Sequence, residues 1–94
     1  MPTWDKTARF NRDYATLSKE NQAEFMAAVS DFVADLKAGD GFRNGLRVKG
    51  VRGRPGVFEM SWAGDGRATF RYGDSVREGE AHIIWLQVGT HDIL

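Results

Sequence analysis

Cysteine is absent from this 94-residue chain, and histidine occurs only twice. A disulfide framework, a thiolate nucleophile and a cysteine metal site are therefore excluded. His82 and His91 lack the closely spaced carboxylate partners of a zinc site, so we expect no metal and no small-molecule cofactor. The sequence also lacks a run of about 18 apolar residues and an apolar leader at its start. We therefore expect a cytoplasmic protein without a membrane partner.

Length and composition are those of one globular domain, residues 1–94, with a single modest core. The formal net charge is zero, but residues 43–77 carry eight Lys or Arg against three Asp or Glu. The flanking segments are acidic. Arginine dominates the basic middle, and a guanidinium binds phosphate oxygens in pairs, so a phosphate-bearing partner is one explanation. The coding bias of a GC-rich genome is the other.

Residues 57–72 predict a β-hairpin closed by a Gly/Asp turn at residues 63–66. Side chains alternate between the two faces of a strand. One predicted face is apolar and consists of Phe58, Met60, Trp62, Ala68, Phe70 and Tyr72. The opposite face is polar and consists of Glu59, Ser61, Arg67, Thr69 and Arg71. The first face suits a core, and the second is either simply solvated or functional.

Helical and strand periodicities predict the remaining elements. A strand is expected within residues 3–10 and a short helix over 11–17. An amphipathic helix is expected over 19–38, with Ser18 as its N-cap and Gly39 after its last turn. Strands are expected at 46–51 and 82–88, separated from the hairpin by polar turns. The order β-α-α-β-β-β predicts an α+β fold with two N-terminal helices packed on one face of an antiparallel sheet.

Strict alternation in the last strand places Ile84, Leu86 and Val88 on one face. Ile83, Trp85 and Gln87 then share the other face, and His91 falls on the Gln87 side if the strand continues. The expected polar sheet face comprises Arg47, Lys49, Glu59, Ser61, Arg67, Thr69, Arg71, Gln87 and His91.

Such a face contains the groups that RNA cleavage without a metal requires. A carboxylate can take the 2′-hydroxyl proton, guanidiniums can stabilise the charged phosphorus centre, and an imidazole can protonate the leaving oxygen. Glu59, Arg67 or Arg71, and His91 form one such set. Alternatively, Glu59 makes a cross-strand ion pair with Arg67 or Arg71, and His91 only caps the C-terminal end. His82 is expected to be structural.

Several segments resemble the RelE/ParE superfamily of bacterial toxin–antitoxin toxins. They are F-x-R-D-Y-x-x-L (residues 10–17), D-L-x-x-G (35–39), L-R-V-K-G (46–50), V-F-E-M-S-W (57–62), G-R-A-T-F (66–70) and W-L-Q-V-G-T-H-D-I (85–93). The resemblance implies a compact α+β fold and a cognate antitoxin as partner. It implies that Arg67 is the arginine that engages the scissile phosphate, and that His91 is the late histidine of the YafQ- and HigB-like branches.

The resemblance leads to the hypothesis of a metal-independent, ribosome-dependent mRNA endonuclease, with mRNA and rRNA as partners. The RelE branch has two lysines where this chain has Glu59 and Ser61, which favours a Glu/Arg/His arrangement with Glu59, Arg67 and His91 as catalytic residues. The residues expected to bind RNA phosphates are Arg47, Lys49, Arg52, Arg54 and Arg71. The alternatives are a ParE-like inhibitor of DNA gyrase that does no chemistry, or an inactive toxin-like binding module.

Overall fold

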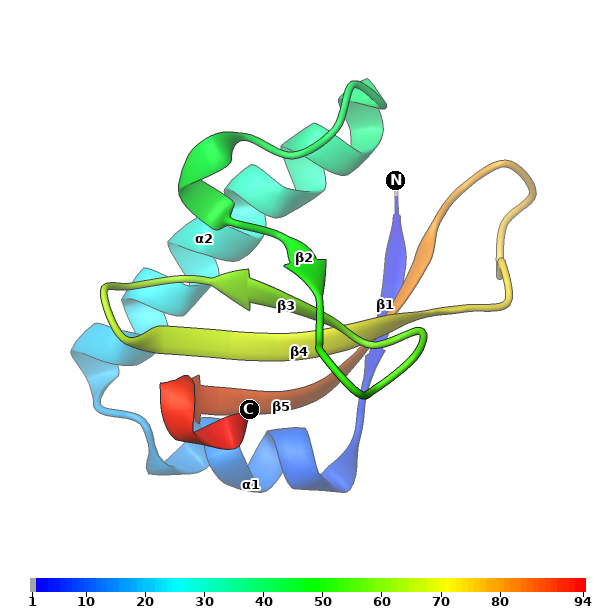
Figure 1. The fold of residues 1–94 in the computed structure, drawn as a ribbon. Helices are drawn as coiled ribbons and strands as arrows, with labels where there is room; N and C mark the ends of the chain where they lie inside the picture. The colour runs from blue at the N-terminus through cyan, green and yellow to red at the C-terminus, as the bar shows by residue number, and fades with distance from the viewer. Residues whose placement is uncertain (1) are drawn as a thin grey trace.

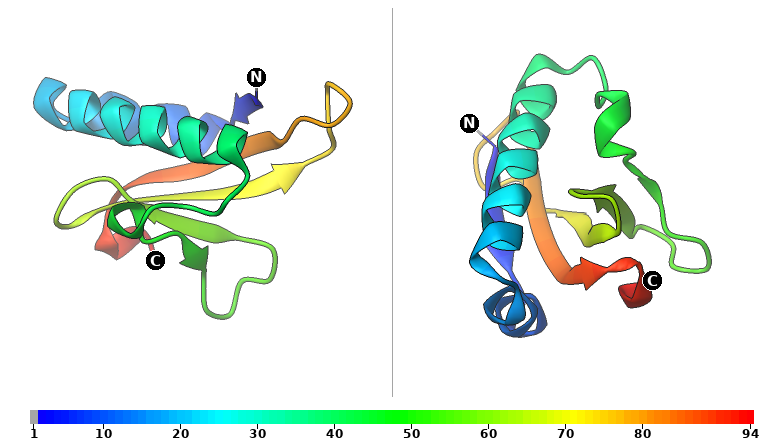
Figure 2. Two further views of the ribbon diagram at one scale, coloured as in Figure 1. Left: turned by 90° about the horizontal axis from the view of Figure 1, so that it is seen from above. Right: turned by 90° about the vertical axis from the view of Figure 1, so that its left-hand side faces the viewer.

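The computed structural model describes residues 2–94 and shows two α-helices against a five-stranded sheet (Figure 1). In chain order the elements are β1 (Thr3–Lys6), α1 (Ala8–Thr16), α2 (Lys19–Ala38), η1 (Asn44–Leu46), β2 (Lys49–Gly50), β3 (Phe58–Ser61), β4 (Gly66–Gly73), β5 (His82–Thr90) and η2 (His91–Ile93), where η denotes a 3₁₀ turn. Both α-helices lie on one side of the sheet, and the β2–β3 loop and η2 lie on the other (Figure 2). We call this second side the outer face.

The α+β architecture is therefore confirmed, with one difference in the sheet. The strand order is β1-β5-β4-β3-β2, and β1 runs parallel to β5 while the other neighbours are antiparallel. The expected element string also counted one strand fewer. Within residues 2–94, no helix has the length and apolar character needed to cross a membrane.

Local capping fixes the helix boundaries. The expected limits of α2 are confirmed: the Ser18 side chain accepts a hydrogen bond from the backbone N–H of Asn21 (3.1 Å), and Gly39 is left-handed with φ 75°. The N-terminal strand is shorter than expected and α1 begins earlier. The reason is Thr7, whose hydroxyl accepts from the N–H of Phe10 (3.0 Å) and starts the helix there.

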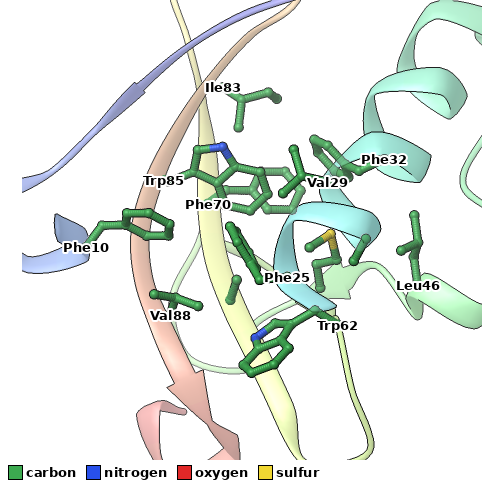
Figure 3. Close-up of a cluster of buried hydrophobic side chains, with 13 residues drawn as sticks. Phe10, Phe25, Val29, Phe32, Leu46, Trp62, Phe70, Ile83, Trp85 and Val88 are labelled. Carbon is green, nitrogen blue, oxygen red and sulfur yellow. The ribbon is translucent and has the colours of Figure 1, made fainter. Parts of the chain in front are cut away.

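The core lies between α2 and the inner face of the sheet (Figure 3). Phe25, Val29 and Phe32 of α2 are buried against strand residues such as Phe70 and Trp85. Phe32 meets Phe70 edge-on, with ring centroids 5.0 Å apart. The predicted alternation of the hairpin is confirmed for most of its apolar set, because Met60, Ala68 and Phe70 are buried in the core. Tyr72, near the end of β4, is exposed.

The last strand departs from simple alternation. Thr69 pairs with Gln87, whereas the next residue, Phe70, pairs with Trp85, so Leu86 is an extra residue in β5. This is a β-bulge, in which two residues of one strand oppose one residue of its neighbour. The expected face assignment was therefore wrong for half of the strand.

The bulge shifts the facing of every residue beyond it. Ile83 and Trp85 before the bulge, and Val88 after it, are all buried in the core. Gln87 lies on the outer face with Thr69, as expected, but Ile83 and Trp85 do not share that face and pack in the core instead. The bulge in this way lets two apolar residues before it and Val88 after it all reach the core, while Gln87 stays outside.

Helix α1 holds the bulged segment from the side. The Thr7 hydroxyl donates to the carbonyl oxygen of Leu86 (2.9 Å), and the Thr7 N–H donates to the carbonyl of Trp85 (3.1 Å). The N–H of Val88 reaches the Asp13 carboxylate (3.4 Å). Backbone groups of β5 that lie past the end of β1 thereby keep hydrogen-bond partners.

The strand expected at residues 46–51 is reduced to two residues. Arg47 has a left-handed backbone (φ 49°) at the end of η1, and Leu46 turns into the core. The loop before it is tied to α2 by Arg43, which bonds Asp35 (2.9 and 3.0 Å) and contacts Asp31 (3.1 Å). The hydrogen bond from Arg43 lowers the pKa of Asp35, and the same contact raises the pKa of Arg43.

We expect Gly66→Ala to destabilise the fold by about 1–3 kcal/mol, the usual cost of overpacking. A Cβ at Gly66 would lie 2.5 Å from Cε2 of the Trp62 ring. Urea unfolding measures the effect. Gly64→Ala in the same turn is the control, because a Cβ there meets nothing within 4 Å. Equal unfolding midpoints for the two variants would contradict this packing.

The Asp35–Arg43 pair predicts a pH dependence of stability. A carboxyl with a lowered folded pKa stabilises the protein above its unfolded pKa of about 3.9, and this contribution is lost as the pH falls through the folded pKa. The stability deficit of Arg43→Met should therefore be largest near neutral pH and shrink in acid. Chemical unfolding across pH tests this, with Arg52→Met as control. A deficit that is the same at all pH values would refute the coupling.

Candidate functional site

The strand register lines up one polar residue from each of four strands on the outer face. Lys49 of β2 lies opposite Glu59 of β3, Glu59 lies opposite Thr69 of β4, and Thr69 lies opposite Gln87 of β5. Directly opposed residues have Cβ atoms about 4.5–5.5 Å apart. We call these four residues the transverse row. It brings together residues that are far apart in the sequence.

Glu59 is buried within this row rather than open to solvent. Only 7% of the residue is exposed, and Nζ of Lys49 lies 3.7 Å from its Oε1. The Lys49 side chain itself is 63% exposed. The alternative of an ion pair therefore describes the structure, but the partner is Lys49 and not Arg67 or Arg71. The Glu59 carboxylate is therefore both paired and largely shielded from solvent in this structure.

Arg54 is held at the other end of the row. It comes from the β2–β3 loop, and its two terminal nitrogens donate to Oε1 of Gln87, each at 3.2 Å. The Thr69 hydroxyl donates to the same oxygen at 3.4 Å. Thr69 is completely buried although it lies on the face turned away from α1 and α2. Its neighbours on the outer face, together with the loop, therefore cover it.

Arg67 lies one step along β4 from the row. It faces Ser61 on one side and Gly89 on the other. Its Nη1 donates to the carbonyl oxygens of Gly66 (2.8 Å) and Gly64 (3.3 Å). Arg67 is diagonal to Glu59 across the strand pair, a relation that separates positions by about 7–8 Å. The guanidinium of Arg67, however, is directed at the carbonyls of the β3–β4 turn.

His91 is at the same end of the sheet as Arg67. Arg67 pairs with Gly89 and Gly66 pairs with Thr90, so His91 follows directly after this end of the strand pair. The expectation that the strand continues to His91 is wrong, because β5 ends at Thr90. The chain turns into η2 there, and Cγ2 of Ile93 lies 3.0 Å from the Cβ position above Gly89. The imidazole is exposed.

The remaining predicted cations are more scattered. Arg52 and Arg71 are exposed, on the β2–β3 loop and on β4, and Arg47 lies outside β2. Of the predicted cations, Lys49 contacts Glu59, Arg54 contacts Gln87 at the far end of the row, and Arg67 lies one step from the row on β4. His82 is structural, as expected, and its ring nitrogens meet the Thr3 hydroxyl (2.7 Å) and the Asp5 carboxylate (3.1 Å) on β1.

Sequence reasoning missed Gln87 and Thr69 as site residues. Both had been placed on polar positions of strands without a role. The one signal was that Gln87, a polar residue, shared its predicted face with Ile83 and Trp85. Such a conflict between a polar side chain and a core face indicates a break in alternation.

No protein-family model matches the sequence, and no curated protein matches it. Solved structures do match. A chain of the E. coli DinJ–YafQ toxin–antitoxin complex has 13% identity and a TM-score of 0.71, with 99% of this chain and 96% of that chain covered. The YoeB/ParE toxin from Agrobacterium tumefaciens has 16% identity and a TM-score of 0.67, with 95% and 98% covered.

The Mycobacterium tuberculosis RelBE2 toxin–antitoxin complex contains a chain with 25% identity and a TM-score of 0.54. The match covers 94% of this chain and 95% of that chain. In each case nearly the whole of both chains is superposed. The protein described here therefore has the fold of the RelE/YafQ-like toxin superfamily.

The Lys49–Glu59 contact predicts a measurable energetic coupling. A double-mutant cycle of Lys49→Met and Glu59→Gln should give about 0.2–1 kcal/mol, because the exposed lysine keeps the pair partly screened. Urea unfolding at neutral pH measures each variant, and added salt should reduce the coupling. The matched control is the cycle of Arg71→Met with Glu59→Gln. A coupling as large in that control would show that the carboxylate has a different partner.

Proposed function

We propose that this protein is the toxin of a toxin–antitoxin pair and that it acts as an endoribonuclease. The observation that carries the proposal is the end-to-end fold likeness to chains of two toxin–antitoxin complexes and to a YoeB/ParE toxin. A cognate antitoxin is accordingly the proposed protein partner. Ribosome-bound mRNA is the proposed substrate, with rRNA as a further contact and the cytoplasm as the place of action.

The outer face supports the chemistry of RNA cleavage by an internal attack. In the proposed reaction Glu59 takes the proton of a 2′-hydroxyl, whose oxygen then attacks the adjacent phosphorus. Arg67 contacts the non-bridging oxygens and stabilises the charge that builds on them. His91 gives a proton to the departing 5′-oxygen as the phosphorus–oxygen bond breaks. The products are a 2′,3′-cyclic phosphate and a 5′-hydroxyl end.

The other basic residues would hold RNA away from the reacting bond. Lys49, Arg52, Arg54 and Arg71 lie on or beside the outer face, and Arg47 lies just before β2. Each can neutralise a backbone phosphate, and this binding does not depend on base sequence. In this scheme guanidiniums supply the positive charge at the phosphate, so we propose that the reaction needs no metal ion.

A ParE-like inhibitor of DNA gyrase is the second candidate. The observation that favours it is the burial of Glu59 beneath Lys49, since a surface that only binds its target needs no exposed base. The resemblance to a YoeB/ParE toxin is compatible with either activity. The two candidates differ in what the cell loses, namely intact mRNA or intact DNA.

Induced expression tests the nuclease directly. We expect growth arrest and new transcript ends that carry a 5′-hydroxyl. We also expect the purified protein to cleave ribosome-bound mRNA without magnesium taking part in the chemistry. Glu59→Gln and His91→Ala should each slow cleavage by about 10²–10⁴-fold, the usual contribution of a proton-transfer group. Arg67→Ala should also lose activity, whereas Arg77→Ala, in the β4–β5 loop, is the control.

The outcomes separate the candidates. Cleavage at the wild-type rate by Glu59→Gln and His91→Ala would reject the proposed mechanism. Growth arrest with intact transcripts, DNA breaks and rescue by a gyrase variant would replace the nuclease with the gyrase inhibitor. Expression without any growth defect would leave only an inactive binding module.

A further inference from the structure

Arg54 has an unusual position for an arginine in a tight turn. It follows Gly53 and precedes Pro55, two residue types that favour turns. Here the residue is half-buried, and its guanidinium reaches Gln87, 33 residues further along the chain. In the sheet order, β3 and β4 lie between β2 and β5. The side chain therefore lies across the outer face and not away from it.

The chemistry of the contact fixes the orientation of the glutamine amide. A guanidinium has donors and no acceptor, so only the amide oxygen of Gln87 can face it. The Thr69 hydroxyl points its donor at the same oxygen. Three donors thus converge on one atom, and this atom comes from a strand packed on the core. Gln87 thereby gives the loop arginine a rigid support.

The partner of Arg54 holds the guanidinium without cancelling its charge. Arg43 shows the contrast: its guanidinium is neutralised by Asp31 and Asp35, as expected for a contact that only fixes a loop. A neutral amide leaves the full positive charge of Arg54 in place. The guanidinium has five N–H groups, and those not directed at Gln87 remain for an anion.

We propose that Gln87, assisted by Thr69, is a positioning residue that holds Arg54 over the transverse row as a preorganised phosphodiester-binding group. The inference rests on the proposed function, because it names how the same face would grip its RNA. The long side chain is then already ordered in the folded protein. Less conformational entropy is lost when Arg54 binds a phosphate, so the binding is stronger. Arg52, two residues earlier on the same loop, is exposed and serves as the internal comparison.

The test uses the full-length protein and a fluorescent 2′-O-methyl oligoribonucleotide, which lacks the attacking hydroxyl and cannot be cleaved. Fluorescence anisotropy across a salt series gives the affinity and its salt dependence. We expect Arg54→Met to weaken binding about tenfold, the size of one charge-assisted contact, and to lower the salt slope by about one. Gln87→Met should weaken binding by a smaller factor, and the double variant should be no weaker than Arg54→Met.

Gln87→Glu distinguishes positioning from a merely structural role. It keeps an acceptor for Arg54, so the unfolding midpoint should be unchanged or higher, but it cancels the charge of the guanidinium. The affinity of Gln87→Glu for the oligonucleotide should therefore fall to that of Arg54→Met. Arg52→Met should lose less affinity than either variant. Gln87→Glu also remains informative if Gln87→Met fails to fold.

Each outcome decides the matter. Wild-type affinity in Gln87→Glu, or additive losses in the double variant, would overturn the role of Gln87 and leave the proposed nuclease standing. A wild-type protein that does not bind the oligonucleotide would instead remove the RNA function, and this inference with it. Cleavage assays with normal RNA would separate that case from a loss of chemistry alone.

Discussion

One extra residue in β5 determines which side chains of that strand reach the core and which reach the outer face. Leu86 forms the bulge, and the Thr7 hydroxyl at the start of α1 bonds its carbonyl. If β5 instead kept regular alternation through Leu86, with Trp85 in the core, Gln87 would point at the helices and Val88 would point away from them. Bulges commonly re-aim a side chain beside a functional site. Here the re-aimed side chain is the one that supports Arg54.

Sequence periodicity predicted those parts of the fold whose signals are local. The limits of α2 follow from Ser18 and Gly39, residues that act within one turn of themselves. The hairpin follows from alternation and a Gly/Asp turn. The parallel pairing of β1 with β5 and the bulge depend instead on contacts across almost the whole chain, such as Thr7 with Leu86, 79 residues apart. A pattern within a short window contains no information about such contacts.

In the candidate site, too, local features were predictable and those set by distant contacts were not. Alternation correctly placed Glu59 and Arg67 on one face, because both belong to one hairpin. It gave the wrong ion-pair partner, since the opposition of Lys49 to Glu59 depends on where a two-residue edge strand begins. Arg47 with its left-handed backbone delays that beginning. Alternation also placed Gln87 on this face correctly, but its contact with Arg54 depends on a loop 33 residues away, which no local pattern predicts.

The cations of the outer face differ in what holds them, and the difference has a consequence for binding. Carbonyl oxygens of a turn hold Arg67 and an amide oxygen holds Arg54, so both keep their full charge, whereas Lys49 is paired with Glu59. An anion bound near Lys49 would compete with Glu59 for the lysine, whereas Arg54 and Arg67 attract an anion without losing a partner of opposite charge. If the proposed chemistry is correct, the phosphate that binds is therefore also the group that draws the lysine aside. Binding of the substrate and exposure of the base would then be one event, which explains why a buried carboxylate and a binding surface occupy the same row.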